Sequence, residues 1–557
     1  MRFLPVNLHA VLVELDDLAQ TLALLQSLQT APVAGVEELI PAARTILIYF
    51  NPTLTQLPRL IDAVGRRRLG AQVEHARHRV QIPVRYDGED LQEVADLLGV
   101  TPADVVRMHT GGEYAVAFTG FAPGFAYLSG GDARLDVPRR KTPRTRIPAG
   151  AVGLAGTFSG VYPQASPGGW QIIGTTPVQM WDLERVAPSL LRPGYRVQFV
   201  DVATLSPEAL AALMAACAGE RVAPEESTGD AADAAFRVEA AGLQTLFQDG
   251  GRPGHAGQGV GASGAMDRGA LRAANRVVGN VAADKAAPGV DAACLEVAYG
   301  GLALEALQAA VVAVTGADAL VEVLTAGGRR YAVNTYAPLA LDAGDRLIVH
   351  APQAGSRNYV AVRGGWSVVP VLGSASTDTL ARVGPAALAV GDALQVGSDA
   401  GLPPVALAEQ AAFDMPRADE EVCLDVVLGP RTDWFAAQAL VTLCAQTWAV
   451  TPQSNRVGIR LQGEIPLARA QTRELPSEGT ARGAIQVPAS GQPVLFLADH
   501  PLTGGYPVIA SVASYHLDLA GQIPVNARVK FRVVRAFDVA ETVQACAVAA
   551  SPEDITQ

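Results

Sequence analysis

Glycine and proline interrupt this chain along its whole length. The 557 residues include 55 Gly and 37 Pro, scattered without a period between many short runs of Val, Leu and Ile. Because both residues favour turns and weaken the interiors of helices and strands, such frequent interruption permits only short elements. Short apolar runs separated by turns are typical of β-strands. The sequence therefore predicts a β-rich protein.

One local pattern recurs and supports the same prediction. A turn is followed by an alternating apolar strand in PGYRVQF (193–199), AGDRLIV (343–349), VGDALQV (390–396) and VNARVKF (525–531). The spacing is irregular, which excludes a solenoid. The pattern fits either related antiparallel β units or hairpins that are alike only by chance.

The length predicts several domains, since 557 residues exceed what one hydrophobic core usually organises. The acidic segment GERVAPEESTGDAADAA has little to bury and indicates a linker between two modules. Strand-like and amphipathic segments at the start predict a small α/β domain. The predicted boundaries are 1–78 for this α/β domain, 79–215 for a β domain, 216–235 for the linker, 236–415 and 416–546 for two β lobes, and 547–557 for a tail.

The formal charge of −12 argues against a nucleic-acid partner, because an acidic chain does not attract a polyanion. The five cysteines lie far apart and form no C-x-x-C pair, so neither a disulfide framework nor a thiolate zinc site is indicated, and a reducing cytoplasm is expected. The first residues do not resemble a secretory signal, and the most apolar region, 302–324, carries acidic residues. We therefore expect no membrane partner.

Two segments of the first module carry residues suited to binding. VAFTGFAPGFAYLSG (116–130) crowds aromatic side chains, Phe121 and Phe125 among them, around backbone-shaping glycines and a proline. It fits either a pocket wall or a tight turn over a small aromatic core. PRRKTPRTR (138–146) holds five cations, including Arg139 and Arg144, which fit either a carboxylate or phosphate site or a solvated surface. Gln171, in the glycine-rich stretch that follows, is a further pocket candidate.

The second module opens on a glycine-rich segment, QDGGRPGHAGQGVGASGAMD (248–267), followed by an expected helix. Within it, GVGASG (259–264) matches G-x-G-x-x-G, but no strand leads directly into it and the acidic Glu296 lies too far downstream to bind a ribose. We therefore reject a dinucleotide site, while the helix start could still bind an anion. The polar candidates of this region are Gln248, Asp249, Arg252, Asp267 and Asn275.

A second group of polar residues lies near the carboxyl end. Asp499 follows the buried-looking strand PVLFLA, and a carboxylate in that place serves either catalysis or the capping of a turn. The candidates of this region are Arg456, Glu478, Gln486, Asp499, Thr503 and Tyr506.

Several cofactor motifs are absent from the sequence. No G-x-x-x-x-G-K-[ST] occurs and no Met is followed by Lys, which excludes a P-loop and a biotin-acceptor Met-Lys. His75 and His78 lack the intervening Glu of a zincin helix. We therefore expect no metal site and no biotin attached to this chain.

Together these segments resemble two protein families joined in one chain. Residues from about 5 to 200, with GFAPGFAYL, PRRKTPRTRIPAGAVGLAG and YPQASPGGWQIIGTTP, resemble the B subunit of 5-oxoprolinase, also called the allophanate hydrolase subunit 1 or Kip-type inhibitor family. Residues from about 236 to 540, with QDGGRPGHAGQGVGASGAMD, LGSASTD, GPRTDWF and LTGGYP, resemble the C subunit, in the allophanate hydrolase subunit 2 family. The resemblance implies a β-rich α+β fold class, with cyclophilin-like β-barrel domains and a small N-terminal α/β domain.

The resemblance also implies an activity. The A, B and C subunits of 5-oxoprolinase together hydrolyse 5-oxo-L-proline to L-glutamate with ATP. This chain would supply the B and C subunits as one cytoplasmic polypeptide, with a separate protein like the A subunit as its partner, ATP with Mg²⁺ bound at the level of the complex, and a homo-oligomer as a further option. Two alternatives stay open within the family: the carboxyltransferase component of a biotin-dependent urea or amide carboxylase, and a Kip-type regulator of a sensor histidine kinase.

For the oxoprolinase reaction, cations must bind the phosphate and the substrate carboxylate, and a general base must lie near the reacting atoms. The candidate catalytic residues are Asp249, Asp267, Glu478 and Asp499. The candidate substrate- or phosphate-binding residues are His109, Phe121, Phe125, Arg139, Arg144, Gln171, Gln248, Arg252, Asn275, Arg456, Gln486, Thr503 and Tyr506. Because pockets commonly form between domains, we expect the glycine-rich segments of the two modules to meet.

Overall fold

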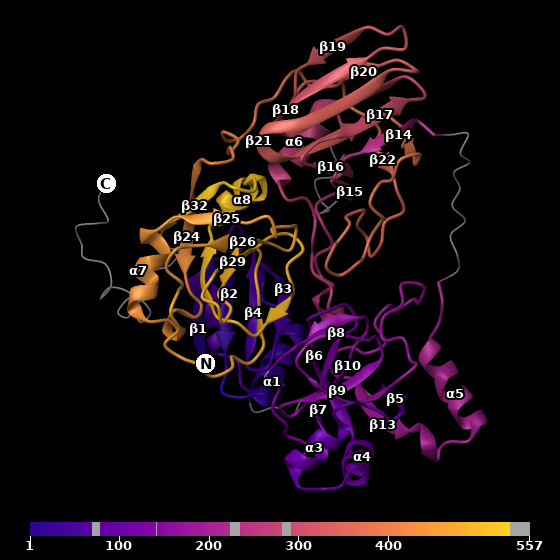
Figure 1. The fold of residues 1–557 in the computed structure, drawn as a ribbon, viewed down its shortest axis with the longest axis vertical. Helices are drawn as coiled ribbons and strands as arrows, with labels where there is room; N and C mark the ends of the chain where they lie inside the picture. Colours follow the sequence, from indigo (N-terminus) through magenta and orange to yellow (C-terminus); the bar gives the residue numbers. More distant parts are fainter. Residues whose placement is uncertain (70–77, 141, 223–233, 281–290, 535–557) are drawn as a thin grey trace.

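The computed structural model describes residues 1–69, 78–140, 142–222, 234–280 and 291–534. Most of its regular structure is strand, arranged in four main sheets, one of them a closed barrel (Figure 1). The predicted β-rich class and its barrels are therefore confirmed. Most of the predicted linker and the whole predicted tail lie outside the described residues, as does His75.

The N-terminal unit is a small antiparallel sheet covered by two helices. Its strand order is β1-β2-β4-β3, and the longer helix begins after Asp17, whose side chain accepts a hydrogen bond from Gln20 N at 2.8 Å. Leu24, Ile46 and Leu60 meet in the core between the sheet and the helices. The elements are β1 (Arg2–Asn7), β2 (Ala10–Glu14), α1 (Leu18–Thr30), β3 (Val36–Pro41), β4 (Thr45–Phe50) and α2 (Leu57–Gly65).

The second unit is a nearly closed barrel. Its sheet has the order β12-β9-β10-β7-β6-β13-β5, and Arg85 and Thr175 exchange backbone hydrogen bonds of 2.8 Å that join its two ends. Helix α4 begins in a capping box of Thr101 and Asp104, with Pro102 in its first turn. The elements are β5 (Arg79–Val84), α3 (Leu91–Leu98), α4 (Pro102–Gly111), β6 (Tyr114–Thr119), β7 (Ala126–Gly130), β8 (Arg144–Ile147), β9 (Ala151–Ala155), β10 (Phe158–Val161), β11 (Ser166–Gly168), β12 (Gln171–Thr175), β13 (Arg196–Asp201), η1 (Val202–Thr204) and α5 (Pro207–Ala218).

The third unit is a ten-stranded sheet at the far end of the molecule in Figure 1. Two long strands, β18 and β21, pair with each other, and helix α6 packs against both. Helix α6 buries an apolar face that includes Leu271 and Val278. The elements are β14 (Phe236–Ala241), β15 (Gln244–Gln248), η3 (Ala256–Gln258), α6 (Arg268–Val278), β16 (Cys294–Ala298), β17 (Leu302–Ala306), β18 (Ala310–Leu324), β19 (Arg330–Val333), β20 (Leu339–Leu341), β21 (Arg346–Val362), β22 (Trp366–Ser367) and β23 (Ala393–Val396).

The fourth unit is the closed barrel β24-β31-β28-β29-β26-β25-β32. Large apolar side chains such as Trp448 and Phe531 fill it. The elements are β24 (Glu421–Leu428), η4 (Thr432–Trp434), α7 (Ala437–Ala445), β25 (Trp448–Val450), β26 (Gly458–Gln462), β27 (Glu478–Gly479), β28 (Ala484–Gln486), β29 (Val494–Phe496), β30 (Thr503–Gly504), β31 (Val508–Val512), η5 (Ser514–His516), α8 (Leu517–Gln522) and β32 (Arg528–Val533).

The N-terminal sheet packs against the closed barrel, although the two lie at opposite ends of the chain (Figure 1). Leu12 and Leu47 of the sheet share a buried apolar cluster with Ala481 and Leu502 of the barrel unit. The backbone N–H of Ala43 donates to Ser477 O at 3.2 Å across the same contact. The two modules are therefore joined by a packed interface as well as by the chain. None of the described helices is long and apolar enough to cross a membrane.

Candidate functional site

The glycine-rich segment 248–267 lies where the two modules meet. Gly124 N donates to Gln258 O at 2.9 Å, and Thr119 Oγ1 donates to Ala256 O at 2.8 Å. Gly259 has φ +78°, and a Cβ on it would lie 2.6 Å from Ala122 O, so only glycine allows this close approach. The predicted contact between the glycine-rich segments of the two modules is therefore present.

Three polar candidates hold this segment against the loop 371–378. The Asp249 carboxylate accepts hydrogen bonds from the hydroxyls of Ser374 and Ser376 and from two backbone N–H groups. Arg252 donates to the backbone carbonyls of Val371 and Ser376, while its Nη1 is buried without a partner among the described residues. Gln248 Nε2 donates to Thr377 O at 2.8 Å. These bonds fix the backbone of the segment.

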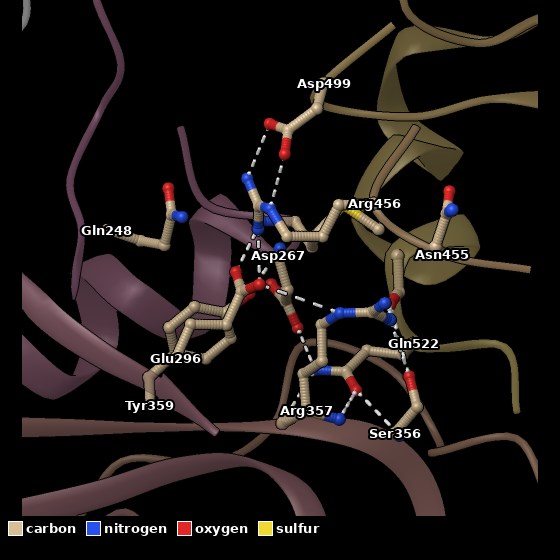
Figure 2. A network of polar contacts seen from close by, with 12 residues as sticks. Gln248, Asp267, Glu296, Ser356, Arg357, Tyr359, Asn455, Arg456, Asp499 and Gln522 are labelled. Carbon is tan, nitrogen blue, oxygen red and sulfur yellow. Dashed lines mark hydrogen bonds and ion pairs between the residues drawn. The ribbon is translucent and has the colours of Figure 1, made fainter. Parts of the chain in front are cut away.

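A buried charge network connects the third unit to the closed barrel (Figure 2). Arg456 makes two hydrogen bonds of 2.9 Å to Asp499 and an ion pair with Glu296 of the other unit. Glu296 also accepts a hydrogen bond of 2.8 Å from the Tyr359 hydroxyl. Ser263 Oγ and Thr379 Oγ1 donate to the two oxygens of Asp499.

The chemistry of Asp499 follows from these partners. Burial opposes ionisation of its carboxyl, but the ion pair with Arg456 outweighs that effect and lowers the pKa. Both of its oxygens are occupied by donors, so an ionised Asp499 is an anchor between units. The network positions the glycine-rich segment, which contributes Ser263 to it.

Helix α6 carries two further candidates. Asp267 caps its start, accepting from Ala270 N at 2.8 Å and from Gln522 Nε2 at 2.9 Å. Burial, reinforced by the negative charge of Asp518, raises the pKa of Asp267 to about 7. Asn275 donates to Ala292 O at 2.7 Å and so ties the helix to its neighbouring strand.

Glu478 lies at a second contact between the modules. It pairs with the buried Arg431, whose Nη1 lies 2.8 Å from Glu14 Oε1 of the N-terminal sheet. Burial raises the pKa of Glu478, and the hydrogen bonds from Arg431 oppose that shift. A cavity of about 140 Å³ lies beside this triad, lined also by Arg44 and Arg473.

The cation cluster of the first barrel is partly neutralised. Arg144 forms two hydrogen bonds of 2.8 Å to Asp90, which also binds Arg140. Arg139 is half-buried and forms no ion pair within the described ranges. It lies beside Gly505 of the second module, where a Cβ would be 3.8 Å from its Nη1. Among the described cations of this cluster, Arg139 and the exposed Arg146 therefore form no ion pair.

The aromatic candidates form a small core. Phe125 packs edge-to-face against the rings of Phe121 and Trp170, with ring centroids 5.3 and 5.4 Å away. Gln171 Nε2 reaches Pro138 O at 3.5 Å, and its Oε1 is buried without a partner in the described chain.

His109 lies deep in the first barrel. It hydrogen-bonds with the Tyr86 hydroxyl at 2.7 Å and with Ser159 Oγ at 2.8 Å. Burial lowers its pKa to about 3, so it stays neutral at physiological pH. Tyr86 also lines an open groove of about 690 Å³ on the barrel surface.

Three candidates of the closed-barrel unit lie near the first module. Thr503 sits against Gly120, and its Oγ1 is buried without a partner among the described residues. Gln486 Nε2 donates to Tyr506 O at 3.0 Å. Tyr506 is exposed, with the Arg469 guanidinium 5.5 Å from the centre of its ring. The region around Thr503 and Arg139 therefore combines residues of both modules.

Sequence reasoning missed several residues of the network. Glu296, Arg357 and Gln522 lie in ordinary-looking strand and helix segments with no motif around them. Asp378 was overlooked inside LGSASTD, although burial and the negative charge of Asp499 raise its pKa to about 7. The described residues contain no cluster of His, Cys, Asp and Glu that could hold a metal ion.

Comparisons with known proteins agree on the two halves of the chain. The family described as carboxyltransferase domain, subdomain C and D, matches residues 1–191, and carboxyltransferase domain, subdomain A and B, matches residues 258–533. The chain is 40% identical over 190 residues to the 5-oxoprolinase B subunit of Bacillus subtilis, which covers 31% of this chain and 79% of that protein. It is 35% identical over 299 residues to the 5-oxoprolinase C subunit of Escherichia coli, covering 53% of this chain and 90% of that protein.

Two more distant comparisons extend this result. Urea amidolyase of Saccharomyces cerevisiae is 31% identical over 315 residues, which cover 53% of this chain and 16% of that protein. The crystal structure of a protein named TTHA0988 superimposes with a TM-score of 0.77 at 34% identity, covering 94% of this chain and 99% of that one. The arrangement of both modules in a single chain therefore has a solved counterpart.

Proposed function

The chain belongs to the carboxyltransferase-domain family that includes the B and C subunits of 5-oxoprolinase, and on that premise we propose that it acts as both subunits, fused, of an ATP-dependent 5-oxoprolinase. Together with a separate protein like the A subunit it would hydrolyse 5-oxo-L-proline to L-glutamate. ATP with Mg²⁺ is a cosubstrate of the whole complex in this proposal. We place the complex in the cytoplasm.

The chemistry explains why ATP is required. A lactam carbonyl is a poor electrophile, so its oxygen first takes the γ-phosphoryl group of ATP and ADP leaves. Water then attacks the activated ring carbon and the C–N bond breaks, so the ring nitrogen becomes the amino group and the carbon is left as an acyl phosphate. A second water hydrolyses the acyl phosphate, which releases phosphate and leaves the side-chain carboxylate of glutamate. Cations must bind the phosphoryl group and the substrate carboxylate, and a base must accept the proton of water.

The observation that carries the proposal is the joining of the B-like and C-like modules by the contact of segments 119–124 and 255–260. Both modules contribute residues near this contact whose polar side-chain groups lack a hydrogen-bond or ion-pair partner in the described structure. We propose Arg139 and Thr503 as substrate- or phosphate-binding residues, because each lacks a partner in the described structure. We propose no base, because Asp267, whose pKa is raised to about 7, is buried at the start of helix α6 with both oxygens hydrogen-bonded.

The second candidate function is the carboxyltransferase step of a biotin-dependent carboxylase. The 31% identity with urea amidolyase over 53% of this chain favours it. It requires a biotin carboxylase and a biotin carrier as partners, because the chain has no Met-Lys acceptor of its own. The two functions differ in their dependence on biotin.

Avidin binds biotin and therefore distinguishes the oxoprolinase from the carboxyltransferase function. The chain is mixed with the A-type partner protein, 5-oxo-L-proline and MgATP, and glutamate is measured with and without avidin. The proposal predicts glutamate release that avidin leaves unchanged. Turnover that requires bicarbonate and stops with avidin would support the carboxyltransferase instead.

A further inference from the structure

Two arginines of the second module lie together at the junction of three units. Arg268 is the first residue of helix α6, and Arg482 precedes strand β28 in the closed-barrel unit. Both contact the same short segment: Arg268 Nη2 lies 3.5 Å from Ser263 O, and Arg482 Nη2 donates to Met266 O at 2.6 Å. The two guanidiniums are close enough to repel each other, which adds to the effect of burial in lowering the pKa of Arg268 to about 10.

Neither guanidinium is fully satisfied by protein groups. The Nε atom of each arginine is buried without a hydrogen-bond partner among the described residues. The nearest anion to both is Asp518, but its two oxygens accept the backbone N–H groups of Arg268 and Gly269, each at 3.0 Å. Asp518 lies 3.9 Å from Arg482 Nη2, too far for a hydrogen bond. One carboxylate therefore faces two cations and binds the side chain of neither closely.

The N-terminal sheet closes the third side of this junction with Tyr49 and His9, and Glu38 lies opposite Tyr49 on the neighbouring strand. The Tyr49 hydroxyl hydrogen-bonds with the backbone of Arg482, and the ring of His9 stacks on Tyr49 with centroids 5.9 Å apart. Burial and the two arginine charges lower the pKa of His9 to about 4, so it is neutral at pH 7. Glu38, the acidic residue of this side, accepts hydrogen bonds from the backbone N–H groups of Gly254 and Ala256 and forms no ion pair with either arginine in the described structure.

His500 contributes a second neutral imidazole. Its Nδ1 lies 3.0 Å from the Pro501 carbonyl oxygen, which can only accept, so Nδ1 carries the proton and Nε2 keeps its lone pair. Burial lowers the pKa of His500 to about 4. Arg482 keeps 13% of its side-chain surface exposed, and His9, Tyr49, Arg268 and His500 are partly buried.

Two neighbouring guanidiniums that keep unused donors and share one distant carboxylate form a protein environment suited to an oxyanion. We propose that Arg268 and Arg482 bind a small oxyanion, a carboxylate or a phosphate, at the junction of the N-terminal sheet, helix α6 and the closed barrel. The ligand would supply acceptors to both guanidiniums and neutralise their repulsion. The site is separate from Arg139 and Thr503, and it stands whether or not the proposed reaction is correct.

Binding is measured directly on the full chain, without any partner or turnover. Inorganic phosphate, 5-oxo-L-proline and bicarbonate are each titrated by calorimetry and thermal melting, with chloride keeping the ionic strength constant. Saturable binding of phosphate identifies a phosphoryl site, binding of 5-oxo-L-proline a substrate carboxylate site, and binding of bicarbonate a carboxyl-donor site. Each of these outcomes supports an oxyanion site, and absence of binding by all three overturns it.

The variants R268Q and R482Q locate the binding. We expect each to weaken it at least tenfold, because each removes a charge-assisted pair of hydrogen bonds. Without anion, neither should melt earlier than R460Q, a matched change of an exposed arginine, since losing one cation relieves repulsion. Anion binding that survives in both variants would overturn the proposal. If a Gln variant does not fold, R268K and R482K, which keep the charge but lose the bidentate geometry, give the same comparison.

Discussion

Arg456 and Asp499 face each other in a bidentate ion pair, with both nitrogen–oxygen distances at 2.9 Å. The same guanidinium pairs with Glu296 from the third unit, so one buried cation holds two carboxylates of different units together (Figure 2). Removing it would leave two buried anions without compensation.

The substitution R456M should therefore destabilise the protein strongly. We expect a loss of about 3–5 kcal/mol in the free energy of unfolding, measured by urea denaturation. The matched variant R460M changes an exposed arginine of the same segment and should stay within about 0.5 kcal/mol of the wild type. Equal stability of the two variants would refute this role of Arg456.

The contact between Gly120 and Thr503 should be sensitive to one methyl group. A Cβ on Gly120 would overlap Thr503 Oγ1 and lie 2.8 Å from its Cγ2, so G120A should force the modules apart and lower the melting temperature. G120A/T503A removes the clashing atoms and should recover part of the loss. G111A, at a glycine with open space around it, is the control and should be neutral. A neutral G120A would show that the modules do not pack this way.

The pH dependence of stability should carry the signature of His109. Its folded pKa of about 3 lies below the ordinary 6.5, so the unfolded chain binds the proton first. Its contribution is complete above pH 6.5 and falls by about 1.4 kcal/mol per pH unit as the pH decreases toward the folded pKa. H109Q should therefore show a shallower loss of unfolding free energy between pH 6.5 and 5 than the wild type, and parallel curves would contradict this.

The quantity to compare is the difference in unfolding free energy between wild type and H109Q, because other buried groups titrate as well. His9 and His500 act in the same direction as His109. Asp267 and Asp378 act in the opposite direction, since their raised pKa values of about 7 cause stability to fall as the pH rises from 3.8 toward 7. These contributions are common to wild type and H109Q and cancel in the difference.

Local chemistry made part of the structure predictable. Thr101-Pro102 and Ser206-Pro207 mark the starts of α4 and α5 in the sequence, because a capping hydroxyl and a proline at the first turn act within a few residues. The glycine-rich segment 248–267 was recognisable because close backbone contact requires glycine, and several glycines occur there in the sequence. The β-rich class followed from the frequency of turns.

Long-range relationships were not predictable in the same way. Nothing near His9 or Glu14 indicates that the N-terminal sheet packs on a barrel more than 400 residues away along the chain. Asp249 and Asp499 were expected as catalytic candidates, but their donors, such as Ser374 and Arg456, come from distant segments. Arg268 and Arg482 carry no motif, and only the fold places them together. Whether a charged group is paired or free to bind a ligand depends on tertiary contacts.

The central claim is that this one chain serves as both the B and the C subunits of a 5-oxoprolinase. The direct measurement is glutamate release from 5-oxo-L-proline and MgATP by the A-type partner protein alone, by this chain alone, and by their mixture over a range of molar ratios. The account predicts little release by either protein alone and release by the mixture that saturates as the chain is added. Equal turnover by the chain without its partner, or no turnover by the mixture, would contradict it.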